Sequence, residues 1–109
     1  SSLSNVAFKS SLLIVKVSGE LDHHFADEIR IRIDAELIKP PVRDILFDFN
    51  GLSFMDSSGI GMIMGRYKKV KALGGKAWII CNNPNATRIL EMSGVFQFIE
   101  KCESIHDAV

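Results

Sequence analysis

Short apolar stretches alternate with amphipathic stretches along this chain of 109 residues, and the alternation restricts the folds open to it. The apolar stretches have the length and continuity of buried strands, whereas the amphipathic stretches have the period of helices. Their order predicts an α/β fold: a mixed, mostly parallel sheet of about five strands with helices packed on it. The predicted strands comprise two within 6–17, joined by a tight turn at 9–11, and three more at 44–49, 76–81 and 96–99.

Capping residues mark the ends of the predicted helices. The first helix follows Asp22 and has an inward stripe, the second spans 57–73, and the third follows Asn83. A fourth helix is expected to begin in 104–109. We also expect Gly19 to break the second strand. The first helix, second helix and third helix should end at Pro40-Pro41, Gly74-Gly75 and Gly94, respectively. The inward stripe of the first helix comprises Phe25, Ala26, Ile29, Ile33 and Leu37.

Composition excludes several classes of protein. An apolar fraction of 47% over 109 residues predicts one globular domain spanning 1–109. Thirteen basic residues balance thirteen acidic ones, so charge provides no basis for binding nucleic acid or an anionic membrane. Cys81 and Cys102 lack the spacing of a metal site, and we expect reduced thiols in the cytoplasm. No apolar run reaches the ~18 residues that span a bilayer.

The candidate functional site is the turn that presents Asp56, Ser57 and Ser58 between the strand 45–49 and the second helix. Hydroxyl groups at a helix start lie among unpaired backbone N–H groups, at the positive end of the helix dipole. Such a site tolerates a phosphate. A plain helix cap is the simpler interpretation, but capping is compatible with a surface that is switched by phosphorylation.

Two further features are expected near these serines. When the second helix is projected at about 100° per residue, Met62 points away from the sheet, as an adaptable apolar docking residue would. Asp22, His23 and His24 follow a neighbouring strand end, so they should lie at the same rim as Ser57. The projection also assigns Ile60, Ile63, Met64, Tyr67 and Val70 to the sheet side, and Arg66, Lys69 and Leu73 to the side of Met62.

Three other kinds of site are weighed against this interpretation. Gly59, Gly61 and Gly65 follow a strand, but their spacing departs from the dinucleotide-binding pattern, and small residues also let a partner or a neighbouring element approach. The adjacent histidines point in different directions and have no third ligand nearby, so no metal is expected. The sequence has no G-x-S-x-G motif of the kind that presents a nucleophilic serine, so no catalytic residue and no cofactor are assigned. A small nucleotide-binding or hydrolytic α/β domain remains the alternative.

Four segments carry a resemblance to a known family. They are 19–24, 52–61, 65–68 and 92–96, which hold Gly-Glu-Leu-Asp-His-His, the Asp-Ser-Ser-Gly turn, Gly-Arg-Tyr-Lys and Met-Ser-Gly-Val-Phe. In this order they resemble the STAS domains, and among them the anti-sigma F factor antagonists of spore-forming bacilli. The resemblance implies that Ser57 accepts the phosphate. It also implies a partner-binding surface built from Asp22, His23, His24, Asp56, Ser57, Ser58, Gly59, Ile60 and Met62.

The resemblance further implies a mechanism. In such proteins the unphosphorylated antagonist binds a dimeric anti-sigma factor, which is also an ATP-dependent serine kinase of the GHKL type. Binding releases the sporulation sigma factor. The kinase then phosphorylates the antagonist on the first serine of the turn, and a membrane-bound serine phosphatase removes the phosphate. Family members carry a further C-terminal helix, of which this chain would hold the start.

Overall fold

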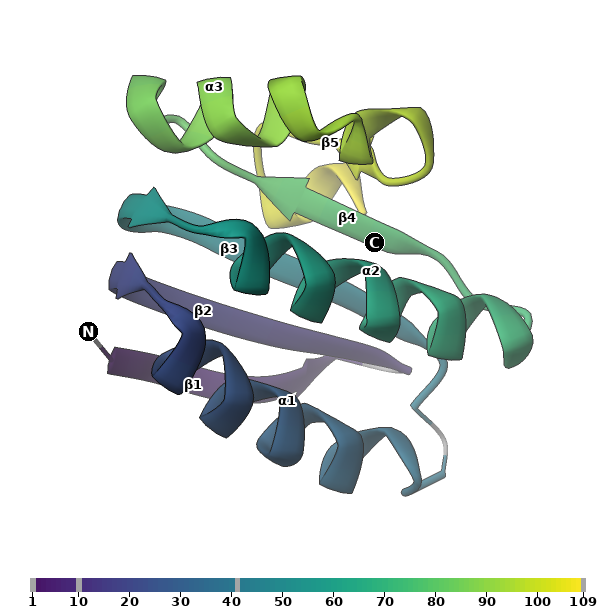
Figure 1. Cartoon of the computed structure of the whole chain (residues 1–109). Helices are drawn as coiled ribbons and strands as arrows, with labels where there is room; N and C mark the ends of the chain where they lie inside the picture. Colours follow the sequence, from purple (N-terminus) through teal and green to yellow (C-terminus); the bar gives the residue numbers. More distant parts are fainter. Residues whose placement is uncertain (1, 10, 41, 109) are drawn as a thin grey trace.

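The computed structural model describes residues 2–9, 11–40 and 42–108, whose strands form one sheet in the order β1-β2-β3-β4-β5. The first pair is antiparallel and the others are parallel. The predicted α/β class with a mixed, mostly parallel sheet of about five strands is therefore confirmed (Figure 1). The strands are β1 (Ser2–Lys9), β2 (Leu12–Leu21), β3 (Asp44–Met55), β4 (Ala77–Ile80) and β5 (Glu100–Lys101); the helices are α1 (His23–Leu37), α2 (Ser57–Ala72) and α3 (Pro84–Ser93), with 3-10 turns η1 (Val95–Gln97) and η2 (Ile105–Asp107).

The main core lies between the sheet and the helices α1 and α2, which run side by side on one face (Figure 1). The predicted stripe of α1 faces this core, with Phe25 half-buried and the other four residues buried. On α2, Ile63 and Val70 are buried, and the other predicted inward residues are partly buried against the core. Helical periodicity therefore identified the buried side of α1 and, in part, that of α2.

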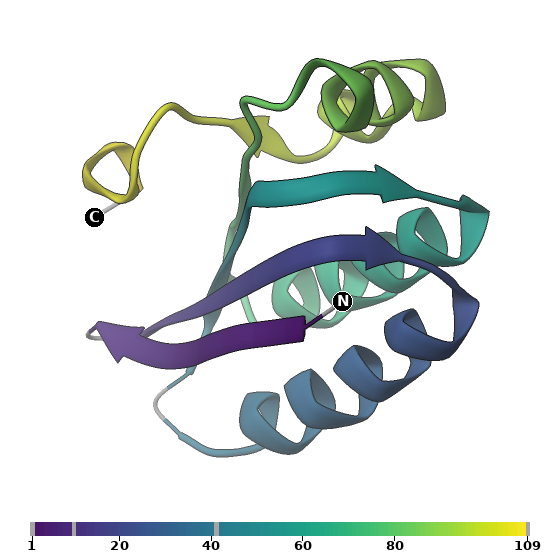
Figure 2. The same ribbon diagram turned by 90° about the vertical axis from the view of Figure 1, so that its left-hand side faces the viewer.

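The opposite face of the sheet is covered by the end of the chain. Figure 2 shows the C-terminal segment on the other side of the sheet from α1 and α2. Cys102 is buried there with Leu46 and Trp78, and Ile105 packs against them. Both faces of the central strands are thus covered, which explains why their sequences are almost continuously apolar.

The helix caps occur where the sequence predicts them. Asp22 Oδ1 accepts a 3.0 Å hydrogen bond from the Phe25 N–H at the start of α1. Asn83 caps α3, and the left-handed residues Gly74 and Gly94, with φ of 79° and 84°, end α2 and α3. Caps are predictable because they depend on residues within one turn of each other.

The predicted ends of two strands are wrong. β3 does not stop at Phe49 but continues to Met55, and Gly19 lies inside β2 instead of breaking it. The pairing of β2 with β3 shifts register next to Gly19, whose φ is 87°, and then resumes until Leu21 pairs with Met55. A bulge absorbs the glycine, so both strands extend to the start of their helices.

The C-terminal predictions also need correction. The predicted strand 96–99 overlaps η1, and β5 begins only at Glu100. Val95 and Ile99 are buried four residues apart, a spacing that a helical turn satisfies and an alternating strand does not. In place of the start of a longer helix, the residues after Ser104 form the single turn η2, closed by a capping box with Asp107.

Candidate functional site

The candidate site lies where β2 and β3 end side by side. The Asp56 N–H donates a 3.2 Å hydrogen bond to the Leu21 carbonyl oxygen, one residue before Asp22. This bond joins the loop that carries Asp22, His23 and His24 to the loop that carries the serines. We call the exposed residues Asp22, His23, His24 and Ser57, together with half-buried Ser58, the rim. The prediction that these two loops meet at one end of the sheet is confirmed.

Asp56, and not a serine, caps α2. Its Oδ1 accepts hydrogen bonds from the Ser58 N–H at 2.9 Å and the Gly59 N–H at 3.4 Å. The capping carboxylate therefore occupies backbone donors that the sequence predicts to be open to a phosphate. Ser57 is exposed, and its hydroxyl has no part in the cap. A modification of Ser57 would consequently leave the cap in place.

The Asp56→Ala substitution is expected to destabilise the fold by about 1 kcal/mol, because two N–H groups at the start of α2 lose their acceptor. Urea denaturation monitored by circular dichroism measures the change. Ser57→Ala is the matched control, and it should stay within about 0.5 kcal/mol of the wild type because its hydroxyl caps nothing. Equal losses for the two variants would show that Asp56 is not the effective cap.

The three glycines of this region lie inside α2 and do not form a loop around a phosphate. Gly59 is buried, and a Cβ atom there would lie 3.0 Å from Leu21 Cδ2 and 3.3 Å from Met55 Cβ. It therefore lets the start of α2 approach the sheet closely. At Gly61 and Gly65 an added Cβ atom would have no neighbour within 4 Å, so packing does not require glycine at either site. Of these three glycines, only Gly59 is required by the close approach of a neighbouring element.

The two histidines of the rim are exposed, and their rings stack with centroids 4.5 Å apart. Within residues 2–9, 11–40 and 42–108, no three His, Cys, Asp or Glu side chains gather as a metal ion would require. Both cysteines are buried as free thiols, and burial raises the pKa of Cys102 above its ordinary value. The two thiols lie in different clusters of the core.

The prediction that Met62 is exposed is wrong. Only 4% of it is exposed, because α1 lies beside α2 on the same face of the sheet and covers the flank of α2 that carries Met62. Arg66 is buried for the same reason, with 6% exposed. The projection put Met62 and Arg66 on one side of α2, but it could not show that a second helix covers that side. Sequence reasoning therefore missed the space between the helices.

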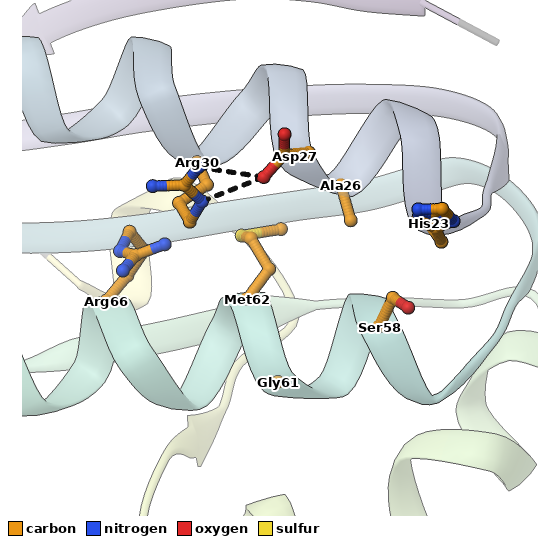
Figure 3. A pocket seen from close by; sticks show the side chains of 8 residues that line it. All are labelled: His23, Ala26, Asp27, Arg30, Ser58, Gly61, Met62 and Arg66. Carbon is orange, nitrogen blue, oxygen red and sulfur yellow. Dashed lines mark hydrogen bonds and ion pairs between the residues drawn. The ribbon is translucent and has the colours of Figure 1, made fainter.

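That space is a cleft of about 360 Å³, which we call the interhelical cleft. Figure 3 shows side chains of α1 and α2 lining it from opposite sides, with His23 and Ser58 at one end and Arg30 and Arg66 at the other. The full lining comprises His23, Ala26, Asp27 and Arg30 from α1, and Ser58, Gly61, Met62 and Arg66 from α2.

Ion pairs hold the arginines of the cleft. Arg30 donates to Asp27 Oδ1 at 3.1 Å and 2.8 Å, and this hydrogen bond raises the pKa of the Arg30 guanidinium. Asp34 lies 3.0 Å from Arg66 Nε and 3.2 Å from Lys69 Nζ. Burial lowers the pKa of Arg66, while the charge of Asp34 opposes that change. The spacing of Asp27 and Arg30 suggests a helical pair, but no sequence pattern joins Asp34 to Arg66.

Comparison with known proteins identifies the family. The family model described as the STAS domain matches residues 4–108, and the chain belongs to this family. The anti-sigma F factor antagonist of Paenibacillus polymyxa is 42% identical over 88 residues, which cover 81% of this chain and 75% of the relative. The protein of the same name from Lysinibacillus sphaericus is 35% identical over 83 residues, covering 76% and 71%. These relatives are regulators rather than enzymes, in agreement with the prediction that this chain is not an enzyme.

Two solved structures share the fold. The anti-sigma factor antagonist SpoIIAA in its unphosphorylated form superposes with a TM-score of 0.83 at 28% identity, covering 95% of this chain and 90% of that one. The Bacillus cell fate determinant SpoIIAA in the phosphorylated form gives 0.75 at 28% identity, covering 95% and 94%. Separately, none of the helices in the described part of this chain is long and apolar enough to cross a membrane.

Proposed function

We propose that this chain is an anti-anti-sigma factor whose rim binds an anti-sigma factor while Ser57 is unphosphorylated. Binding releases a sporulation sigma factor, and phosphorylation of Ser57 reverses it. The observation that carries the proposal is the position of Ser57: its side chain is exposed at the start of α2 and takes no part in the cap. The names of the relatives and the two forms of SpoIIAA support a phosphorylation-dependent role.

The proposed partners follow the family resemblance. The anti-sigma factor is expected to be an ATP-dependent serine kinase of the GHKL type, and a serine phosphatase is expected to act on phosphorylated Ser57. We propose that binding and phosphorylation take place in the cytoplasm. We also propose that residues 1–109 form one STAS domain. No direct contact of this chain with nucleic acid or membrane is part of the proposal.

The partner-binding surface that we propose is smaller than the sequence implies. The rim residues are accessible, and Asp56 and Ile60 are partly so. Gly59 and Met62 are buried, so they are not proposed as direct contacts. Gly59 instead positions α2 against the sheet. The alternative of a nucleotide-binding or hydrolytic domain has no specific observation in its favour, because the glycines lie within a helix.

Phosphorylation by the anti-sigma factor of the same organism tests the proposal. After incubation with that protein and ATP, mass spectrometry should find one phosphate, and peptide mapping should place it on Ser57. The Ser57→Ala variant should take up none, whereas Ser58→Ala should still be modified. A phosphate on Ser58, or steady turnover of a substrate by this chain alone, would contradict the assignment.

A further inference from the structure

The interhelical cleft opens directly from the rim. His23 and Ser58 belong to both, and the cleft runs from them to Arg30 and Arg66 (Figure 3). Ser58, Met62 and Arg66 are spaced four residues apart on α2, so they form one line along the helix about 12 Å long. A partner that covers the rim would therefore cover the mouth of the cleft as well.

The end of the cleft that lies away from the rim has an excess of positive charge. The charged residues that line the cleft there are two cations, Arg30 and Arg66, and one anion, Asp27. Asp34, which pairs with Arg66 and Lys69, lies outside the lining. Arg66 is more than nine-tenths buried, and its Nη1 has no hydrogen-bond partner within the described residues. A buried donor without a partner is unfavourable, and an added carboxylate near the guanidinium would offset that cost.

The lining between the two ends is suited to a short aliphatic chain. Ala26 and Met62 are apolar, and Gly61 carries no side chain that would narrow the space. An unbranched thioether such as Met62 adapts its shape to what it contacts. The cleft thus offers an apolar passage that leads to a cationic end. A glutamate side chain is much shorter than the ~12 Å line from Ser58 to Arg66, so the partner's backbone would have to extend from the rim over the middle of the open cleft, beside Gly61 and Met62, to place the carboxylate at Arg30 and Arg66.

We propose that the interhelical cleft accepts an acidic side chain of the anti-sigma factor that docks on the rim, with its carboxylate paired to Arg30 and Arg66. This inference rests on the proposed function and adds the chemistry of the partner to it. Asp27, whose carboxylate also lines the cleft, holds Arg30 in place in the free protein. In the complex the guanidinium of Arg30 then bonds two carboxylates, one from each protein.

Binding of the anti-sigma factor to Arg30→Gln tests this directly. Loss of one charged contact should weaken binding about tenfold at low salt, with a smaller difference at high salt. Arg30 is partly exposed, so the variant should unfold at the same urea concentration as the wild type. Arg32→Gln is the matched control, because Arg32 is an exposed cation on the same helix that does not line the cleft. Equal affinity of Arg30→Gln and the wild type would overturn the inference.

Charge exchange identifies the partner residue. Arg30→Glu should bind more weakly than Arg30→Gln, and one Asp→Lys or Glu→Lys change on the surface of the anti-sigma factor should restore its affinity. If no acidic position restores binding, the cleft does not accept a carboxylate. Failure of the unmodified wild type to bind the anti-sigma factor would instead overturn the proposed function, so the two failures are distinguishable.

Discussion

A phosphate on Ser57 is expected to weaken binding of the anti-sigma factor about a hundredfold, because it adds roughly two negative charges to the centre of the rim. The adjacent Asp56 already accepts hydrogen bonds from the Ser58 and Gly59 N–H groups, so these two donors are not free to bind the phosphate. A flat docking partner would have to desolvate the phosphate and oppose its charge. Isothermal calorimetry on the bare and phosphorylated chains measures the difference.

Substitutions at the same position separate charge from loss of the hydroxyl. Ser57→Ala should bind like the bare chain and should stay bound in the presence of kinase and ATP. Ser57→Asp should weaken binding less than the phosphate does, since one carboxylate carries less charge. The backbone around Ser57 should not move, because its side chain contributes nothing to the cap. A backbone shift of several ångströms, or equal binding of both forms, would contradict this account.

Gly75→Ala is expected to destabilise the fold by at least about 2 kcal/mol. A Cβ atom there would overlap the carbonyl oxygen of Arg43 and lie 2.8 Å from Asp44 Oδ1. Arg43 directly precedes β3, which begins at Asp44, and Asp44 Oδ1 also accepts a hydrogen bond from the Lys76 N–H at 2.8 Å. The backbone cannot move away without breaking the contact between the end of α2 and the sheet.

Gly65→Ala is the matched control for this prediction. Gly65 lies inside α2 with nothing within 4 Å of the added carbon, so alanine should stabilise the helix by up to about 1 kcal/mol. The two glycine-to-alanine changes should therefore move the urea midpoint in opposite directions. Similar midpoints for both variants would mean that the chain relaxes around Gly75 at little cost.

The turn that contains Gly75 illustrates what sequence reasoning captures. The sequence predicts that Gly74-Gly75 ends α2 in a left-handed turn, and the N–H groups of both glycines do bond back to the last turn of the helix. The reason is local, since every atom involved lies within six residues. The contact of Gly75 with Arg43 spans 32 positions of the chain, and no local pattern indicates it.

The same distinction holds at the candidate site. The sequence located the serines at a helix start and placed Asp22 at the same end of the sheet, because strand order and capping follow from local patterns. It placed Met62 and Arg66 on an open surface, although α1 covers both. It also ended β3 six residues early, because the bulge beside Gly19 depends on pairing with another strand.

The amino-acid sequence alone determined the class of fold, the helix caps and the exposed serine, since each follows from residues close together along the chain. Only the tertiary structure decided that α1 lies against α2, that the interhelical cleft lies between them, and that Arg66 on α2 pairs with Asp34 on α1. The physical reason is that the period of a helix gives the direction in which a side chain points. What the side chain meets in that direction depends on how distant segments pack on the sheet.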